Sequence, residues 1–467
     1  MYRKKITRRD FIGSAGSIAA GIGIGSQAFG ANYLKNTGSK NDKIRMGFIG
    51  VGNRGTQLLD RFRANEDVEV TALCDTYKPY LTRDYSAVHL KYKELGGRIP
   101  EMGENFGKKV KQYNDFRKLL EDKNVDAVCI ATPDHWHAIQ MIQAVDAGKD
   151  VYVEKPLTIT LLEGRKMVEA QKRTGQVVGV GLNRRGSSVY QKLVPEIRGE
   201  KIGKVTVARA MRVSNMAPDG IGKFKSEEPP SDFNWDMWLG PRPYRPYQFN
   251  ICPYKFRWLS EFSTQMGNWG VHYMDTIRWL VGEQAPKAIS AVGGKYVLDH
   301  DGDIPDTMEV VFEFASGMMI TFSIHEACGG VSIANGEIEL KGTKGNISIS
   351  QNGYDIVPSR PGQFQTWEKQ IEEETFDIKS DKQFGDLDIS EDSTANLIRN
   401  FLDCLKSREE PWCPLEEGHR STSFAHLANI ALATKSRIEW DPVKEKILNN
   451  DKANELLHYE YRKPWSL

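Results

Sequence analysis

The stretch that decides the fold is Ile44-Arg45-Met46-Gly47-Phe48-Ile49-Gly50-Val51-Gly52-Asn53-Arg54-Gly55. Its first six residues are mostly apolar and predict a buried strand, and apolar side chains then recur at helical spacing after Gly55. Glycines spaced as G-x-G-x-x-G between a strand and a helix let the backbone turn tightly and approach a pyrophosphate at the helix N-terminus. We therefore expect Gly50, Gly52, Asn53, Arg54 and Gly55 to bind a dinucleotide.

The choice of dinucleotide depends on the strand that follows. Val68–Cys74 is a second apolar run, and it ends in Asp75, 20 residues after Gly55. A carboxylate at this distance from the glycines is placed to accept a hydrogen bond from the adenosine ribose 2′-hydroxyl. It would repel a 2′-phosphate, so the sequence favours NAD over NADP as the cofactor.

Strand and helix patterns keep alternating as far as Gly181. Helices are predicted over 115–120, 137–147 and 160–174, and strands over 125–131, 150–153 and 176–181. This alternation indicates a parallel, doubly wound sheet, so we predict an α/β Rossmann domain over residues 44–182. Residues 77–113 are polar and glycine-bearing, and we expect them to form an insertion near the adenosine end.

The loop after the predicted strand 125–131 carries Thr132, Pro133, His135 and His137. The carboxyl ends of parallel strands face the ligand crevice, so these residues are expected to line the nicotinamide end of the site. A metal site would need at least three ligands, and no carboxylate cluster accompanies the two histidines. The six cysteines include no C-x-x-C pair, and no metal is expected.

After Gly181 the pattern changes to longer strands, several of them separated by glycine-bearing turns. Strands are predicted over 204–213, 287–297, 306–314, 317–324, 336–340 and 346–350. They indicate an α+β domain over residues 183–440 with a large, mostly antiparallel open sheet, one face of which is covered by helices such as 271–280. Residues 441–467 are expected to form a tail that packs back on the body.

Four motifs together resemble the Gfo/Idh/MocA family of oxidoreductases, which includes glucose-fructose oxidoreductase and inositol dehydrogenases. They are the glycine turn, Thr132-Pro133, the run Val151-Tyr152-Val153-Glu154-Lys155-Pro156-Leu157 and the later His272-x-x-Asp275. The resemblance covers nearly the whole mature chain, including the ending Tyr459–Trp465, which looks like the tail of exported members.

The resemblance implies that Lys155 lies beside the nicotinamide and the reacting carbon, with Glu154 and Asn183 among the cofactor contacts. A lysine there can polarise the substrate oxygen and relay its proton, because burial beside a cationic ring lowers its pKa.

The same resemblance places a general base at His272. A histidine would accept the hydroxyl proton while the hydride leaves for the nicotinamide, and its pKa near neutrality suits that role. Asp275 follows one helical turn later and is expected either to orient the imidazole or to bind a substrate hydroxyl. Many family members have an aspartate four residues before the base, whereas this chain has Asn268, so either the proton relay differs or Asn268 holds the substrate.

Aromatic residues gather in the segment that leads to His272. Five of the ten tryptophans fall between residues 235 and 279, and flat aromatic rings can stack on the apolar faces of sugars. Trp269 is a candidate for the substrate wall, and four residues are candidates for the opposite wall, namely Asn183, Arg184, Arg185 and Tyr190. Trp235 and Trp238 are equally compatible with a stacking role and with the core.

The leading hypothesis is an NAD-dependent dehydrogenase that oxidises a hydroxyl of a sugar or glycoside, such as the one at C3. Its rival is a glycosidase of the α-N-acetylgalactosaminidase type, in which the same oxidation is transient and elimination releases the aglycone. That group departs from the Glu-Lys-Pro motif that this chain keeps. The third alternative is a non-catalytic dinucleotide-binding sensor, which would not need the proton acceptor. A homo-dimer or tetramer is expected from the resemblance and from the edge strands.

The first 31 residues have the order of an export signal. A basic segment leads into Thr7-Arg8-Arg9-Asp10-Phe11-Ile12, a twin-arginine pattern, and a small, mildly apolar stretch follows as far as Phe29. We expect a twin-arginine signal peptide over 1–31, a linker over 32–43 and a periplasmic location. Because a periplasm offers little free dinucleotide, an exported enzyme should hold its NAD tightly.

The composition argues against two other classes of protein. The chain has 63 basic and 62 acidic residues, so it lacks the basic excess typical of nucleic-acid-binding surfaces. No apolar run reaches the ~18 residues of a membrane span, and no stable membrane insertion is expected. The length of 467 residues is sufficient for two domains with separate cores.

Overall fold

The computed structural model describes residues 43–104, 106, 110–330, 333, 336–378 and 392–467. The expected signal peptide and all but the last residue of the expected linker lie outside the described residues. In the described part, two β-sheets each support a core of buried apolar side chains. No helix in this part combines the length and the apolar character that a membrane crossing requires.

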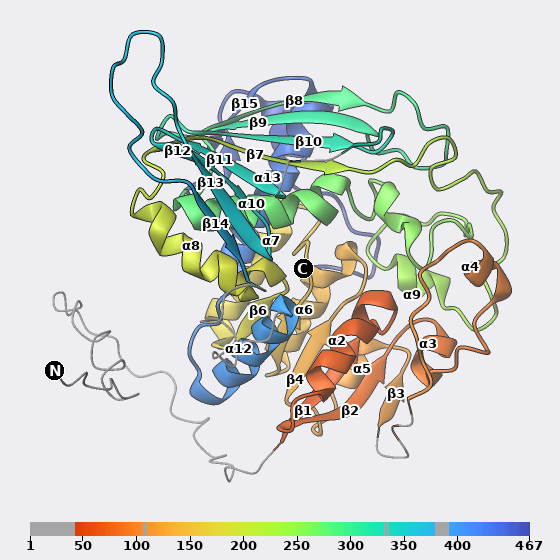
Figure 1. Cartoon of the computed structure of the whole chain (residues 1–467). Coiled ribbons are helices and arrows are strands. Elements are labelled where there is room, and N and C mark those ends of the chain that lie inside the picture. Colours follow the sequence, from red (N-terminus) through yellow and green to blue (C-terminus); the bar gives the residue numbers. More distant parts are fainter. Residues whose placement is uncertain (1–42, 105, 107–109, 331–332, 334–335, 379–391) are drawn as a thin grey trace, which may run out of the picture. The chain divides into compact units, whose positions relative to one another are not determined.

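The first sheet is parallel and doubly wound, with six strands in the order β3-β2-β1-β4-β5-β6 (Figure 1). The strands are β1 Ile44–Ile49, β2 Val68–Cys74, β3 Lys111–Tyr113, β4 Ala127–Ile130, β5 Asp150–Val153 and β6 Val178–Val180. The order reverses between β1 and β4, so a ligand crevice is expected at the carboxyl ends of these strands. The predicted Rossmann fold is confirmed.

Most connections in this sheet are the predicted helices, namely α2 Asn53–Arg63, α5 Phe116–Leu120, α6 His137–Asp146 and α7 Leu161–Thr174. A further helix, α12 (Ser393–Ser407), comes from far along the chain and packs on the same core. The ring of Phe401 in α12 lies 5.6 Å from that of Tyr152 in β5 and 6.3 Å from that of Phe62 in α2. The first core therefore takes up residues that the sequence pattern assigned to the second domain.

Residues 77–113 differ from the prediction in one respect. Two short helices, α3 Lys78–Thr82 and α4 Leu90–Glu94, interrupt the alternation as expected. The last three residues, however, form β3, which pairs with β2 at the edge of the sheet. A three-residue strand with polar side chains has no apolar pattern by which to predict it.

The second sheet has ten strands in the order β14-β13-β12-β11-β7-β10-β9-β8-β15-β16. They are β7 Val205–Val213, β8 Ala288–Gly294, β9 Thr307–Glu313, β10 Met319–His325, β11 Ile338–Gly342, β12 Gly345–Ile349, β13 Gly353–Pro358, β14 Glu374–Asp377, β15 Ile438–Asp441 and β16 Lys446–Ile447. Of the described pairs, only β7 with β10 is parallel. The predicted, mostly antiparallel sheet is confirmed, but β16 belongs to it although its residues were assigned to the tail.

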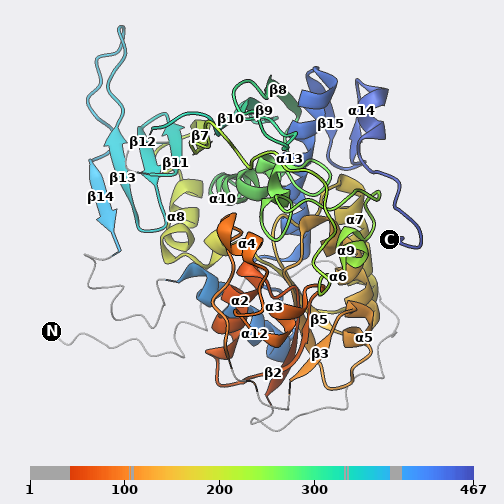
Figure 2. The ribbon, with the colours of Figure 1, turned by 90° about the vertical axis from the view of Figure 1, so that its right-hand side faces the viewer.

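Helices α8 (Ser188–Arg198), α10 (Val271–Val281) and α13 (Leu415–Thr434) lie on one side of this sheet (Figures 1 and 2). α13 packs against α10, β8 and α7, so it joins the second sheet to the Rossmann fold. After α14 (Asp451–Glu455) the chain returns to the Rossmann side, where Tyr461 donates a hydrogen bond to Glu163. The ring of Trp465 then packs 4.7 Å from that of Trp136.

Candidate active site

The glycine turn occupies backbone positions that exclude larger residues. Gly50 has a φ of +83°, in the left-handed region that favours glycine. A Cβ on Gly55 would lie 1.9 Å from the carbonyl oxygen of Gly50, so the first turn of α2 has no room for a side chain there. Gly50 and Gly52 line a pocket with about 920 Å³ of empty space, open solvent included. The turn and the pocket fit the close approach of a dinucleotide.

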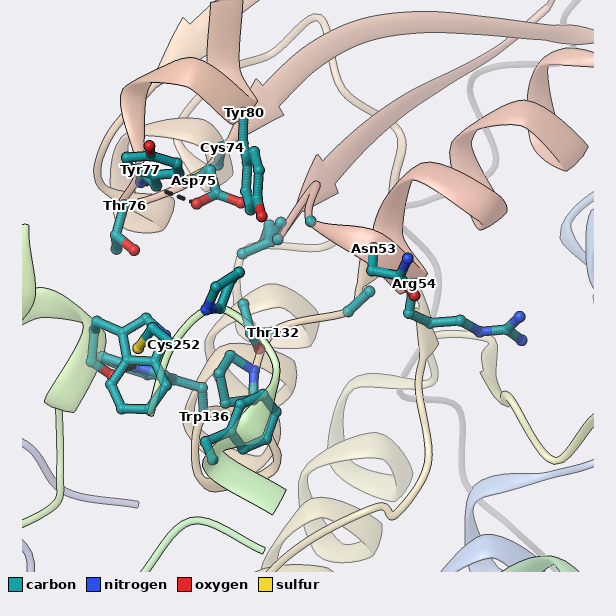
Figure 3. A pocket seen from close by; sticks show the side chains of 18 of the residues that line it. Asn53, Arg54, Cys74, Asp75, Thr76, Tyr77, Tyr80, Thr132, Trp136 and Cys252 are labelled. Carbon is teal, nitrogen blue, oxygen red and sulfur yellow. Dashed lines mark hydrogen bonds between the residues drawn. The ribbon is translucent and has the colours of Figure 1, made fainter. Parts of the chain in front are cut away.

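Asp75 lies at the carboxyl end of β2 and lines the same pocket (Figure 3). Its Oδ2 accepts a hydrogen bond from the Val51 N–H at 2.8 Å and its Oδ1 accepts one from the Tyr77 N–H at 3.0 Å. Burial raises the pKa of Asp75 to about 6. Each oxygen keeps a lone pair, so the carboxylate can still accept a hydrogen bond from a ribose hydroxyl.

The predicted cofactor contacts divide into two groups. Gly50, Gly52, Asn53, Arg54, Asp75, Thr132 and Pro133 line the pocket. His135 and His137 do not, although Trp136 between them does. His135 Nε2 lies 2.9 Å from the carbonyl oxygen of Trp238, and both ring nitrogens of His137 face the carbonyl oxygens of Pro156 and Thr132.

The two histidines therefore hold the backbone around the crevice. This corrects the expectation that they line the nicotinamide end, because a loop position does not fix which way a side chain points.

Glu154 and Arg54 are paired. Arg54 Nε donates to Glu154 Oε1 at 2.9 Å, and the carboxylate is buried. Glu154 is not among the residues that line the pocket, and in this structure its side chain holds the guanidinium of Arg54. Asn183 donates a weak hydrogen bond of 3.4 Å to Ser393 Oγ in α12 and does not line the pocket either.

Lys155 extends from the end of β5 to the second domain. Its Nζ donates to both oxygens of Asn268, the main-chain oxygen at 2.8 Å and Oδ1 at 3.0 Å. The Lys155–Pro156 peptide bond is cis. Burial lowers the pKa of Lys155 to about 8. An ammonium has three donors, so one N–H is left for a further acceptor.

His272 lies in the first turn of α10, within range of the charge of Lys155. Burial, and next the charge of Lys155, hold the pKa of His272 well below its usual range, so the ring is neutral at pH 7. Its Nδ1 is buried and has no hydrogen-bond partner among the described residues. A neutral imidazole beside a partly used ammonium group can accept a proton from an alcohol whose oxygen the ammonium binds.

Asn268 occupies the position at which the resemblance leads one to expect an aspartate. It lies in a π-helical turn, Met266–Gly270, directly before α10. Its Oδ1 accepts the hydrogen bond from Lys155, and its Nδ2 donates to Gln265 Oε1 at 3.3 Å. A neutral amide orients the lysine without adding the negative charge that would raise its pKa.

Comparison with known proteins identifies the family. Residues 44–182 match the family model described as the Gfo/Idh/MocA oxidoreductase family, NAD-binding Rossmann fold, and residues 254–440 match the model of its C-terminal alpha/beta domain. The chain belongs to the Gfo/Idh/MocA oxidoreductase family. It is therefore an oxidoreductase with an NAD-binding Rossmann domain.

Individual relatives point in two directions. A myo-inositol 2-dehydrogenase of Thermotoga maritima is 24% identical over 404 residues, which are 86% of this chain and 99% of that protein. An α-N-acetylgalactosaminidase of Shewanella oneidensis is 31% identical, but over 182 residues that cover 36% of this chain and 38% of that protein. The first relative matches both halves of this Gfo/Idh/MocA chain, and the second matches a little over a third of it.

Solved structures share the fold of this Gfo/Idh/MocA protein. A levoglucosan dehydrogenase in complex with NADH and L-sorbose has a TM-score of 0.61 at 18% identity, over 85% of this chain and 99% of that one. The WlbA dehydrogenase of Bordetella pertussis, in complex with NADH and UDP-GlcNAcA, has a TM-score of 0.60 at 18% identity, over the same shares.

Four residues predicted to bind substrate are engaged with other side chains in this family member. Asp275 is buried and accepts hydrogen bonds from Arg185 Nε at 2.9 Å and from Ser421 Oγ at 2.7 Å. Arg184 forms an ion pair with Glu337, and Tyr190 donates to the same carboxylate at 2.9 Å.

Asp275 therefore does not orient His272 through a hydrogen bond. The two ion pairs hold η3 (Asn183–Gly186) to α10 and to Glu337, the residue directly before β11. Sequence analysis could not predict this, because each partner lies about 90 to 150 residues away.

Three residues that sequence analysis did not place are linked, directly or in sequence, to Trp269: Arg212, Glu326 and Trp258. The guanidinium of Arg212 stacks 4.0 Å over the Trp269 ring, whose centroid is 6.4 Å from that of His272. The charge of Arg212 also acts on Glu326, which accepts a hydrogen bond from Trp258 Nε1 at 2.7 Å. Burial raises the pKa of Glu326 to about 7.

Arg212 lies near the end of β7, and Glu326 follows β10. These are the parallel neighbours of the second sheet, so both side chains reach the same edge. In the sequence, Arg212 and Glu326 stand at the ends of two predicted strands. Predicting that they lie close together would have required knowing that β7 pairs with β10.

The other aromatic residues are mostly core. The rings of Trp235 and Trp238 are buried and stack 4.8 Å apart, which settles the choice between core and wall for Trp235. Trp238 lines the dinucleotide pocket as well. Among the described residues, no group of three or more His, Cys, Asp or Glu side chains is arranged to hold a metal ion.

Proposed function

We propose that the protein is a dehydrogenase that oxidises a hydroxyl group of a sugar or glycoside, such as the ring hydroxyl at C3, with hydride transfer to tightly held NAD. The observation that supports this most directly is the arrangement of Lys155, Asn268 and His272. It combines a donor that has one N–H left for a substrate with a neutral base that the charge of this donor reaches.

The residues divide the chemistry between them. Lys155 donates its remaining N–H to the substrate oxygen, and His272 accepts the hydroxyl proton as the carbonyl forms. When bound, NAD supplies the acceptor for the hydride that leaves the same carbon, so one C–H and one O–H bond break and one C=O bond forms. Because Lys155 must stay protonated to donate, its pKa of about 8 sets an upper pH limit on this role.

The wall around Trp269 suits a polyhydroxylated ring. Trp258 and Trp269 offer flat faces, and Arg212 and Glu326 offer a charged donor and an acceptor for hydroxyl groups. Relatives named as a myo-inositol dehydrogenase and a levoglucosan dehydrogenase support a substrate of this class.

A redox glycosidase is the second candidate, supported by the 31% identity to an α-N-acetylgalactosaminidase. Both activities begin with the same oxidation, and the glycosidase then returns the hydride after the aglycone has left. The retained Glu154-Lys155-Pro156 motif favours the dehydrogenase. A sensor without catalysis is disfavoured, since it would not require a neutral base beside Lys155.

We also propose a periplasmic location through twin-arginine export and a homo-dimer or tetramer. The twin-arginine pattern at residues 7–12 supports the first. Edge strands of the ten-stranded sheet support the second.

The test is to purify the folded protein without added cofactor, release and identify what is bound, and offer a panel of glycosides. Bound NAD that a sugar reduces would establish the dehydrogenase. Release of aglycone without net reduction would establish the redox glycosidase instead. Dinucleotide without any sugar-dependent signal would leave the sensor.

A further inference from the structure

An arginine of the second domain reaches the dinucleotide pocket. Arg257 lies in the 3-10 helix η4, Lys255–Trp258, and lines the same pocket as Gly52 and Asn53. Its guanidinium lies 4.3 Å from the ring centroid of Tyr254 and 4.4 Å from that of Phe256. Its Nη1 donates to the main-chain oxygen of Tyr254 at 2.9 Å. Aromatic rings on two sides therefore hold the planar group in place.

Arg257 has no carboxylate partner within ion-pair distance among the described residues. The nearby acids are already engaged, since Glu154 pairs with Arg54 and buried Asp134 accepts a hydrogen bond from Ser263. Burial lowers the pKa of Arg257. A half-buried guanidinium without a counter-charge is unfavourable, and an anion would relieve this.

A second arginine reinforces the positive charge at the same ring. Arg98, from the insertion after β2, lies 4.5 Å from the centroid of Tyr254 and also has no carboxylate partner within the described residues. The two guanidinium groups lie on the same aromatic ring and repel each other, although one comes from the insertion after β2 and the other from η4. Arg257 lines the pocket and Arg98 does not, so Arg98 adds to the positive charge near the pocket while Arg257 is the one placed to contact an anion there.

The chain closes over this place from both sides. The Asn234 N–H donates to the Thr76 oxygen at 2.8 Å, the Lys78 N–H donates to the Asp232 oxygen at 2.9 Å, and the hydroxyls of Tyr92 and Tyr247 are 2.5 Å apart. These contacts join the insertion after β2 to the segment before η4. A dinucleotide in the pocket would be covered by both.

We infer that Arg257 binds the pyrophosphate of NAD from the side opposite the glycine turn, and that this contact makes the cofactor slow to leave. The inference deepens the proposed retention of NAD and rests on that part of the proposed function. The glycine turn supplies main-chain N–H groups to one face of the diphosphate. Arg257 supplies a charged, two-pronged donor to the other face.

The test measures cofactor exchange and needs no sugar. Protein carrying its bound NAD is mixed with isotopically labelled NAD, and the rate at which label appears on the protein is followed after rapid gel filtration. Arg257→Gln is compared with Arg257→Lys and with Lys255→Gln. Lys255 lies in the same helix and carries the same charge, but it does not line the pocket. Thermal unfolding checks that each variant is folded.

We expect exchange in Arg257→Gln to be roughly 10-fold to 100-fold faster, the range for one hydrogen bond to a charged group. Arg257→Lys should be intermediate, and Lys255→Gln should match the wild type. The affinity for ADP-ribose should fall with that for NAD, whereas the affinity for adenosine, which has no phosphate, should not. If Arg257→Gln does not fold, Arg257→Lys is compared with the wild type instead. Exchange from the wild type should then depend more steeply on salt concentration than exchange from Arg257→Lys.

If Arg257→Gln exchanges NAD at the wild-type rate, the inference is wrong. A raised KM for sugars that bear a carboxylate, together with that unchanged rate, would show that Arg257 binds the substrate instead. If Arg257→Gln exchanges NAD faster but the wild type oxidises no sugar, the role of Arg257 stands and the proposed dehydrogenase activity is wrong. If the wild type binds no dinucleotide, both proposals are wrong.

Discussion

The two sides of the site are built in different ways. The cofactor side consists of the glycine turn and Asp75, within 26 residues of one another, and it functions through backbone shape. The substrate side combines Lys155, His272, Arg212 and Glu326 from four separate segments, and it functions through charge and hydrogen bonding. Substitutions that add a side chain to the glycine turn should therefore impair cofactor binding. Substitutions that remove a charge should impair the substrate side.

The largest effect is expected from Lys155→Met. Removing the donor to the substrate oxygen should lower kcat by roughly 10²-fold to 10⁴-fold, the contribution of a positioned proton-handling group. Bound NAD should stay, because Lys155 contacts Asn268 and not the glycine turn. In the wild type, kcat should fall as the pH rises through about 8, where Lys155 loses its proton.

Steady-state rates across pH, with the NAD content of each preparation, check this prediction. Exposed Lys172→Met is the control, and it should leave both values unchanged. A Lys155→Met protein with wild-type kcat would remove Lys155 from the mechanism.

On the cofactor side, the matched pair is Gly55→Ala and Gly52→Ala. A Cβ on Gly55 would meet the backbone oxygen of Gly50 at 1.9 Å, whereas one on Gly52 would meet the Tyr80 ring at 3.2 Å. A side chain can yield and the backbone of the turn cannot, so Gly55→Ala should be purified without NAD. Gly52→Ala should keep it with a weaker hold. Equal NAD content in the two variants would contradict the assignment of shape to this side.

The same difference decides what could be predicted from the sequence. The Rossmann order, the glycine turn and Asp75 depend on neighbours in the chain, and short apolar runs with fixed spacing indicate them. The pairing of Arg185 with Asp275, of Arg184 with Glu337 and of β7 with β10 depends on contacts between distant residues. Residue type made these arginines look like substrate ligands, and the spacing of Asp275 from His272 did the same for Asp275.

Asp275→Asn tests that correction. Asp275→Asn removes the more buried of the two carboxylate partners of Arg185 and leaves only Glu417, whose Oε2 lies 3.0 Å from Nη2. The free energy of unfolding should therefore fall by about 3 kcal/mol, the lower end of the range for a broken buried ion pair. Glu121→Gln, which breaks an exposed pair with Lys118, should change it by less than about 1 kcal/mol. Denaturant unfolding gives both values. If Asp275→Asn is as stable as the wild type but has a raised KM for the sugar, Asp275 binds substrate after all.

The smallest expected effect is a change with pH in the preference of the protein for NAD over NADP. It depends on the charge of Asp75, which also holds the backbone of the turn. Above a pKa of about 6 the carboxylate is ionised, so it accepts a hydrogen bond from the ribose hydroxyl of NAD and repels the 2′-phosphate of NADP. Below that pKa the carboxyl is mostly neutral and the repulsion fades. Between about pH 7 and about pH 5 the ionised fraction falls about tenfold, so the preference for NAD should shrink by up to about 10-fold.

Dissociation constants of NAD and NADP at several pH values measure this preference, and Asp75→Asn provides the control. The amide has no charge to lose, so its preference should be weak and independent of pH between these values. A wild-type preference that stays constant across the same range would mean that Asp75 discriminates through the backbone it holds, by its bonds to Val51 and Tyr77, and not through its charge. Backbone shape would then govern the adenosine end of the cofactor site.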